Sequence, residues 1–163
     1  MAMATLYATH GITGAGKSTF AKDFCAKKKV VRLSHDDIMV LLYGNNPDEK
    51  LFAGYAEGVD RLLANLAQNL LQNDVDVLLD VGLFKRAERD FWRKLAGECG
   101  AKFVLFYLQC SRETALQRVL KRSKEMPDGA LFIDENAFGV INARLEPLQD
   151  DEEYITLNGE GNS

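Results

Sequence analysis

Residues 9–24 read THGITGAGKSTFAKDF and contain a complete G-x-x-x-x-G-K-[ST] pattern between Gly11 and Ser18. Its glycines permit backbone conformations and close approaches that a side chain would block, so successive N–H groups can turn inward around an anion. A strand is expected before the pattern and a helix after it, which places the anion at a positive helix N-terminus. The pattern predicts a phosphate-binding loop with contacts from Gly11, Ile12, Thr13, Gly14, Ala15, Gly16, Lys17, Ser18 and Thr19.

Two side chains of this loop have separate expected roles. Lys17 should reach the terminal phosphates of a nucleotide, and the hydroxyl of Ser18 should ligate Mg²⁺. The expected cofactors are therefore ATP and Mg²⁺. The loop leaves open whether the chain hydrolyses the nucleotide, switches with it, or transfers its phosphoryl group.

Strand and helix patterns alternate along the chain. Strands are expected over residues 6–10, 30–33, 75–81, 103–108 and 154–157, and helices over residues 17–26, 35–43, 55–70, 87–99, 111–122 and 135–145. Buried strands that alternate with helices favour a parallel sheet covered on both faces. The prediction is an α/β fold of three layers, of the P-loop NTPase type, with about five parallel strands and a small lid that carries arginines.

Length and composition indicate one domain over residues 1–163, with a lid at about 118–136 and a frayed tail at 158–163. The net charge is -4, so no basic field favours nucleic acid. No apolar run is long enough to span a bilayer, and no signal peptide is evident. The three scattered cysteines are expected to be reduced, buried thiols in a cytoplasmic protein. The oligomeric state is left open.

A polar segment, Ser34-His35-Asp36-Asp37, follows the second expected strand. Ser34 and Asp37 form a helix-capping pattern. Asp36 should lie at the sheet edge near the transferable phosphoryl group, where a carboxylate can accept the proton of an attacking hydroxyl. His35 and Asp37 are weaker candidates for acceptor contacts, and purely structural roles are their alternatives.

Asp80 ends the third expected strand and is a candidate to hold Mg²⁺ through water, with a turn cap as the alternative. Lys85 and Arg86 follow it and could clamp an anionic acceptor, although a solvated helix face fits them equally well.

Arg118 and Arg122 are four residues apart, so they share one face of the expected helix. A loop over residues 123–134 follows directly. Arginines at a closing lid would neutralise charge that spreads over the phosphoryl oxygens. Surface pairing with acids is the alternative for both, and Arg144 could be a further phosphate contact.

The chain lacks the N-K-x-D motif of GTPases, and Asp80-Val81-Gly82 does not have the D-x-x-G spacing. The sequence resembles a group of small P-loop kinases. The likeness rests on the phosphate-binding loop, on Ser34-His35-Asp36-Asp37-Ile38, on Asp80, and on Arg118 to Arg122 with Asp134 beyond. This group includes the kinase domain of polynucleotide kinase, the zeta toxins and chloramphenicol phosphotransferase, and the likeness extends to about Pro147. The resemblance implies that Asp36 is the general base and that Arg118 and Arg122 hold ATP phosphates.

One position departs from polynucleotide kinase. Polynucleotide kinase has an arginine that helps hold the acceptor phosphate, and the matching position of this chain is Met39. The loss of that arginine disfavours a phosphorylated polynucleotide as the acceptor. The expected function is transfer of the γ-phosphoryl group of ATP to a hydroxyl of a small molecule, such as an antibiotic, a sugar or a nucleotide-like compound. A polynucleotide 5′-hydroxyl kinase and a nucleotide-binding regulatory or toxin-type module are the alternatives.

Overall fold

A computed structural model describes residues 3–126 and 131–161. Its strands are β1 (Thr5–His10), β2 (Val31–Ser34), β3 (Val77–Asp80), β4 (Lys102–Gln109) and β5 (Ile155–Asn158). They form one parallel sheet in the order β2-β3-β1-β4-β5. The helices of the described part are α1 (Lys17–Lys27), α2 (His35–Tyr43), α3 (Glu49–Gln72), α4 (Arg86–Glu98), α5 (Arg112–Glu125) and α6 (Glu135–Asn142). The predicted α/β fold with a parallel sheet is confirmed.

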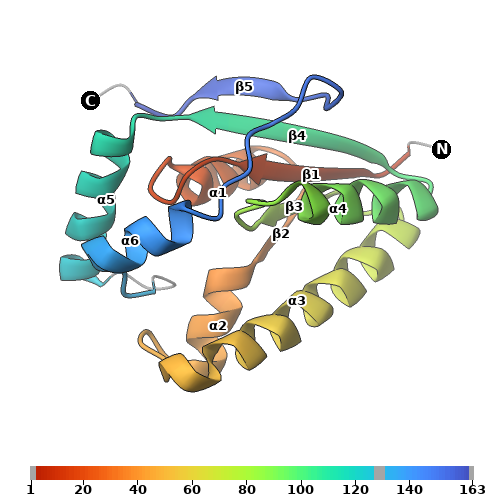
Figure 1. The fold of residues 1–163 in the computed structure, drawn as a ribbon. Coiled ribbons are helices and arrows are strands. Elements are labelled where there is room, and N and C mark those ends of the chain that lie inside the picture. Colours follow the sequence, from red (N-terminus) through yellow and green to blue (C-terminus); the bar gives the residue numbers. More distant parts are fainter. Residues whose placement is uncertain (1–2, 127–130, 162–163) are drawn as a thin grey trace.

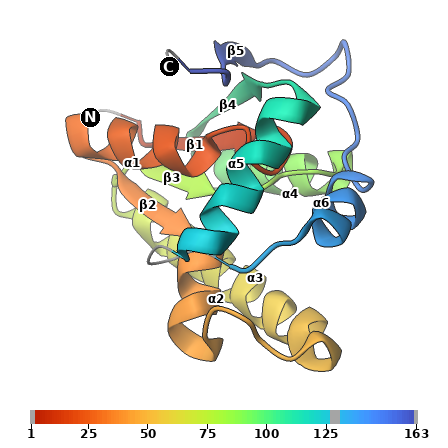
Figure 2. The ribbon, with the colours of Figure 1, turned by 90° about the vertical axis from the view of Figure 1, so that its left-hand side faces the viewer.

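The helices lie in layers around this sheet (Figure 1). Helix α1 contacts β1, β2 and β3, whereas α3 contacts β3 and α4 contacts β4 on the opposite face. Helices α2, α5 and α6 gather where the strands end, and Figure 2 looks onto this edge. Ligands of open α/β sheets bind beyond the carboxyl ends of the strands, so this edge is where a site is expected.

The alternation of side chains along β1 divides the core between the two faces of the sheet. Leu6 and Ala8 point into a buried cluster with α3 and α4 that includes Leu63 and Trp92. Tyr7 points to the other face, where it packs with aromatic side chains of α1 and β4. Burial on both faces explains why these strands read as apolar runs rather than as alternating patterns.

Helix α3 differs from its expected form. It begins at Glu49 rather than at residue 55, because the Asp48 carboxylate accepts a hydrogen bond from the N–H of Lys50 and caps it. Its buried face is Val59, Leu63, Ala67 and Leu71. Leu62 and Leu66 lie outside this face and are 42% and 37% exposed.

The expected frayed tail is wrong for residues 158–160. Asn158 belongs to β5, and the N–H of Gly159 donates to the carbonyl of Gln109. Part of the expected lid, residues 127–130, lies outside the described residues, as do residues 162–163 of the expected tail. The three cysteines are free thiols, but they are half-buried rather than buried.

Within the described residues, no helix combines the length and the apolar character that a membrane crossing requires.

Candidate active site

The loop between β1 and α1 is shaped by two glycines in the left-handed region. Gly14 has φ 89° and Gly16 has φ 95°. A Cβ atom on Gly14 would lie 2.3 Å from the carbonyl oxygen of Ala115, so α5 packs directly against the loop. The loop closes with a turn in which the N–H of Ala15 donates to the carbonyl of Ile12, at 3.0 Å. Gly16 is the N-cap of α1, so the N-terminus of this helix faces the space that the loop surrounds.

Lys17 reaches back across the loop. Its ammonium group donates to the carbonyls of Gly11 and Ile12, at 2.7 and 2.8 Å, and lies 5.6 Å from the ring centre of Phe84. Burial lowers the pKa of Lys17 to about 8, while the carboxylates of Asp80 and Asp36 oppose this shift. A phosphate group in the loop would replace the carbonyls as the partner of this cation.

Ser18 and Asp80 lie together, as the sequence predicts. The hydroxyl of Ser18 donates to Asp80 Oδ1 at 3.1 Å, and Arg32 donates to Asp80 Oδ2 through Nε at 2.9 Å and Nη2 at 2.5 Å. Burial raises the pKa of Asp80, and the charge of Arg32 opposes this. The adjacent hydroxyl and carboxylate are hard oxygen donors that fit Mg²⁺. In the described residues, no group of three or more His, Cys, Asp or Glu side chains could hold a metal ion.

Arg32, which the sequence analysis did not single out, contacts two acids of this site. It sits in β2, and its Nη1 donates to Asp37 Oδ2 at 2.6 Å while its other nitrogens hold Asp80. The N–H of Asp37 donates to Ser34 Oγ at 3.2 Å, so Ser34 caps α2 while the Asp37 carboxylate pairs with Arg32. Register pairs Ser34 with Asp80 across neighbouring strands. The sequence signal for Arg32 is its place in an otherwise apolar strand, shortly before the acids Asp36 and Asp37.

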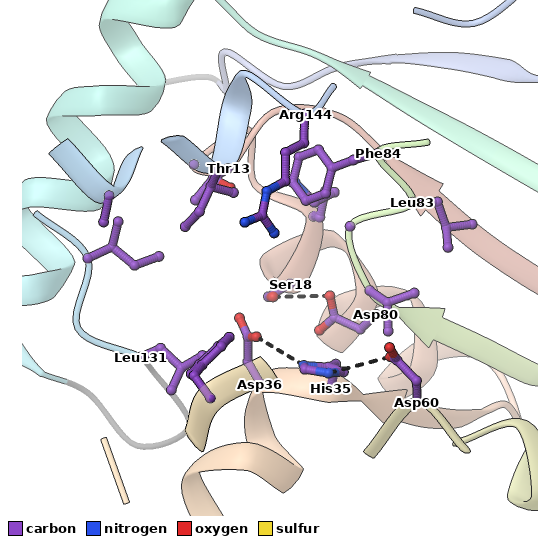
Figure 3. A pocket seen from close by; sticks show the side chains of 18 of the residues that line it. Thr13, Ser18, His35, Asp36, Asp60, Asp80, Leu83, Phe84, Leu131 and Arg144 are labelled. Atoms are coloured by element: carbon purple, nitrogen blue, oxygen red, sulfur yellow. Dashed lines mark hydrogen bonds and ion pairs between the residues drawn. The ribbon is translucent and has the colours of Figure 1, made fainter. Parts of the chain in front are cut away.

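Asp36 stands in the first turn of α2 with a side chain that is 52% exposed, and it lines the central cavity. His35 lies between two carboxylates: Nδ1 is 3.8 Å from Asp36 Oδ1, and Nε2 is 3.5 Å from Asp60 Oδ1 (Figure 3). Burial lowers the pKa of His35, but the nearby carboxylates of Asp36 and Asp60 outweigh it and raise the pKa. His35 therefore connects the start of α2 to α3 beside the Asp36 carboxylate.

The two arginines of α5 differ in what they contact. Both line the cavity. Arg122 has a buried Nε atom with no hydrogen-bond partner among the described residues. Arg118 donates to the carbonyls of Gly159, at 2.5 Å, and of Glu160. In the part of the chain that the structure describes, Arg118 thus holds the segment after β5 beside the loop, whereas no such partner is found for Arg122 Nε.

Helix α6 supplies a contact that sequence reasoning did not anticipate. The amide oxygen of Asn142 accepts a hydrogen bond of 2.9 Å from the N–H of Thr13, and its buried Nδ2 has no partner among the described residues. A lone Asn near the end of a helix gives no distinctive signal. Arg144, just beyond the helix, points into the cavity between Thr13 and Asp36 (Figure 3).

Lys85 and Arg86 are not brought to the cavity, so the expected anion clamp is wrong for Arg86. Its guanidinium binds Asp151 at 2.7 Å and Asp90 at 2.9 Å on the surface. Lys85 is exposed and precedes α4, where its N–H donates to Glu88. The sequence could not place Asp151 beside Arg86, because the two are far apart along the chain.

A buried ion pair holds one wall of the cavity. Arg89 is fully buried and binds both carboxylate oxygens of Glu152, at 2.7 and 2.9 Å. It also donates to the carbonyls of Leu83 and Phe84 at 3.2 and 3.3 Å. His10 hydrogen-bonds the same Leu83 carbonyl at 2.7 Å, and burial lowers the pKa of its imidazole to about 4. The Leu83–Phe84 turn is thus fixed from two sides.

The phosphate-binding loop, Asp36, Asp80, Arg118, Arg122 and Arg144 line a cavity of about 1370 Å³. Residues 131–134, called the roof below, also line the cavity and are held by hydrogen bonds at two points. The hydroxyl of Ser123 donates to the carbonyl of Ile133 at 2.6 Å, and the N–H of Phe132 donates to the carbonyl of Asn45 at 3.1 Å. The segment after residue 130 therefore bridges α5 to the loop before α3, over the space between the phosphate-binding loop and Asp36.

Comparison with other proteins gives relatives of several kinds. A viral protein named "Putative bifunctional polynucleotide kinase/RNA ligase", from Autographa californica nuclear polyhedrosis virus, is 28% identical over 127 residues, which are 72% of this chain and 18% of that protein. The chain thus spans less than a fifth of that relative. Kti12 of Chaetomium thermophilum, solved with ADP-AlF3, matches with a TM-score of 0.70 at 16% identity, over 94% of this chain and 88% of that one.

A gluconokinase from Sinorhizobium meliloti matches with a TM-score of 0.65 at 14% identity, over 97% of this chain and 84% of that one. At these identities the solved structures show the fold alone. The family described as an AAA domain, AAA_33, matches residues 6–148. The sheet, the phosphate-binding loop and this match together show that the chain belongs to the AAA_33 family of P-loop, kinase-like domains.

Proposed function

We propose that the protein is an ATP-dependent phosphotransferase that moves the γ-phosphoryl group to a hydroxyl of a small-molecule acceptor. The position of Asp36 is the observation that carries this proposal. Its half-exposed carboxylate lines the same cavity as Lys17 and Arg122. Phosphates held by these cations would face a base that can take the proton of an attacking hydroxyl.

The other side chains would stabilise the charge of the triphosphate. The loop N–H groups, Lys17, Arg122 and Arg118 would hold its oxygens, and Arg144 could reach them from the end of α6. Mg²⁺, held by Ser18 and through water by Asp80, would neutralise part of the phosphate charge. A roof fastened over the cavity would exclude water and so limit hydrolysis of ATP.

A small acceptor is favoured by two observations. Met39, at the position of the acceptor-phosphate arginine of polynucleotide kinase, is fully buried in the core and so is unavailable to an acceptor. The net charge of -4 also opposes a polyanion. The likeness to a gluconokinase fold is consistent with a small acceptor. A polynucleotide 5′-hydroxyl kinase is the second candidate, because the viral relative carries that activity in its name.

The test is a screen that follows ADP release and product formation across antibiotics, sugars, nucleosides and 5′-hydroxyl oligonucleotides. With a competent acceptor, Asp36→Ala should lower turnover by roughly 10²–10⁴ if the carboxylate is the base. Asp23→Ala is the matched control, since this acid lies on the surface of α1 and pairs with Lys27. Transfer by Asp36→Ala at the wild-type rate would contradict the assignment, and transfer to oligonucleotides alone would favour the second candidate.

A further inference from the structure

The cavity carries an apolar lining in addition to the phosphate-binding loop and the charged side chains. Phe52 of α3, Phe91 of α4, Phe132 of the roof and Val140 of α6 all line it. They are 37%, 51%, 48% and 52% exposed. Single exposed apolar side chains are ordinary on a protein surface, but here four separate segments contribute them to one cavity. Covering them with an apolar ligand would be favourable.

The charges along the cavity are divided between its two ends. Lys17, Arg118 and Arg122 lie at the phosphate-binding end. Helices α3 and α4 contribute four acids to the lining, and the basic side chains on the acceptor side are fewer. The acids are Glu49, Glu57, Asp60 and Glu88, and the bases are Arg61 and Arg144. A phosphate or carboxylate on the acceptor would face this excess of negative charge.

The volume of the cavity also limits what the acceptor can be. Pockets for one small ligand commonly enclose roughly 300–1,000 Å³, and this cavity encloses about 1370 Å³. It has room for a nucleotide and for an acceptor of comparable bulk. A sugar acid would leave most of the apolar wall in contact with water, and its carboxylate would lie beside the acids of α3 and α4.

We propose that the acceptor is an alcohol with a bulky apolar ring system and no negative charge, and that it contacts this exposed apolar lining, to which Phe52 and Phe91 belong. The proposal rests on the proposed phosphotransferase function, because it places the acceptor between these rings and Asp36. In the transfer, the acceptor oxygen bonds to the γ-phosphorus and its proton passes to Asp36. The bond from the γ-phosphorus to the β–γ bridging oxygen breaks, and ADP leaves with that electron pair.

The test compares matched sets of alcohols that differ in one property. One set is adenosine, which has a ring system and no charge, adenosine 3′-monophosphate, which adds a negative charge, and ribose, which lacks the base. Chloramphenicol and gluconate extend the panel. We expect the ring-bearing, uncharged members to have the highest kcat/KM. Phe91→Ala and Phe52→Ala should raise the KM for the best of them roughly tenfold, as loss of aromatic stacking does elsewhere. Leu41→Ala, at an 84% exposed position of α2 outside the cavity, is the control.

A binding measurement separates failure of this proposal from failure of the function. Trp92 is the single tryptophan of the chain and lines the same cavity, so its fluorescence reports ring binding without turnover. If ring-bearing alcohols change this fluorescence but accept no phosphoryl group, the binding proposal stands and the transfer function falls. If gluconate or ribose is the better substrate, or no ring-bearing member alters Trp92, the acceptor class is wrong. Unchanged KM in both Phe variants would also overturn it.

Discussion

Replacement of Glu152 by Gln should destabilise the protein strongly, because it leaves the buried guanidinium of Arg89 without a counter-charge. The side chains of both residues are fully buried. Hydrogen bonds from Arg89, together with the N–H of Gln149, overcome the effect of burial and lower the pKa of Glu152 to about 2, from an ordinary 4.5. That difference corresponds to about 3 kcal/mol. Breaking a buried pair from one side costs about 3–5 kcal/mol, so the two values agree.

Urea unfolding at pH 7 measures this loss directly. The pH dependence gives a second test, because a lowered carboxyl pKa stabilises the fold above pH 4.5 and loses that effect as pH falls toward 2. The wild-type and Glu152→Gln curves should therefore converge in acid. His10 also destabilises the fold as pH falls from 6.5 toward 4, since burial lowers its pKa. The charge of Glu152 opposes that shift, so its loss in Glu152→Gln should enlarge the His10 effect in the variant.

Asp151→Asn is the matched control for this variant. Asp151 binds Arg86 at the surface with a side chain that is 67% exposed, so solvent screens this pair and its loss should cost far less than loss of the buried one. If Glu152→Gln costs no more than Asp151→Asn, the buried pair does not hold the Leu83–Phe84 wall as we argue.

Three further changes test other parts of the site. Gly14→Ala should destabilise the fold and abolish ATP binding in calorimetry, because its Cβ would meet a carbonyl oxygen at 2.3 Å. Gly58→Ala, at a position in open space, is the control and should add up to about 1 kcal/mol of stability. Equal stability of the two variants would refute the close packing at Gly14. Asn142→Ala should weaken ATP binding several-fold, because the loop backbone at Thr13 loses the hydrogen bond that fixes its position, and unaltered affinity would argue against this role. His35→Gln should cost more unfolding free energy at pH 6 than at pH 9. A raised histidine pKa stabilises the fold below pH 6.5, and that stabilisation is lost as pH rises through the folded pKa; a pH-independent cost would contradict it.

Local sequence signals were sufficient for much of the fold. The bounds of α2 match the sequence prediction, because Ser34 caps its start and Gly44 ends it. The phosphate-binding loop follows from glycine positions that tolerate unusual backbone conformations. In each case the physical cause lies within a few residues of the element that it determines.

Contacts between distant segments could not be predicted in the same way. The pairing of Arg32 with Asp80 spans 48 residues, and that of Arg89 with Glu152 spans 63. The segment after β5 is also held by such a contact, because Arg118 donates to the carbonyl of Gly159. Sequence patterns identify these residue types but not the partners that the fold brings to them.

The most direct test of the account follows the γ-phosphoryl group itself. In a single turnover with γ-labelled ATP, Mg²⁺ and the best acceptor of the panel, the wild-type protein should place the label in an ester of the acceptor hydroxyl. Asp36→Asn should bind ATP with similar affinity and form roughly 10²–10⁴ times less ester in the same time. Label that appears only as inorganic phosphate, or equal ester formation by Asp36→Asn, would contradict the claim that this cavity is a phosphotransferase site with Asp36 as its base.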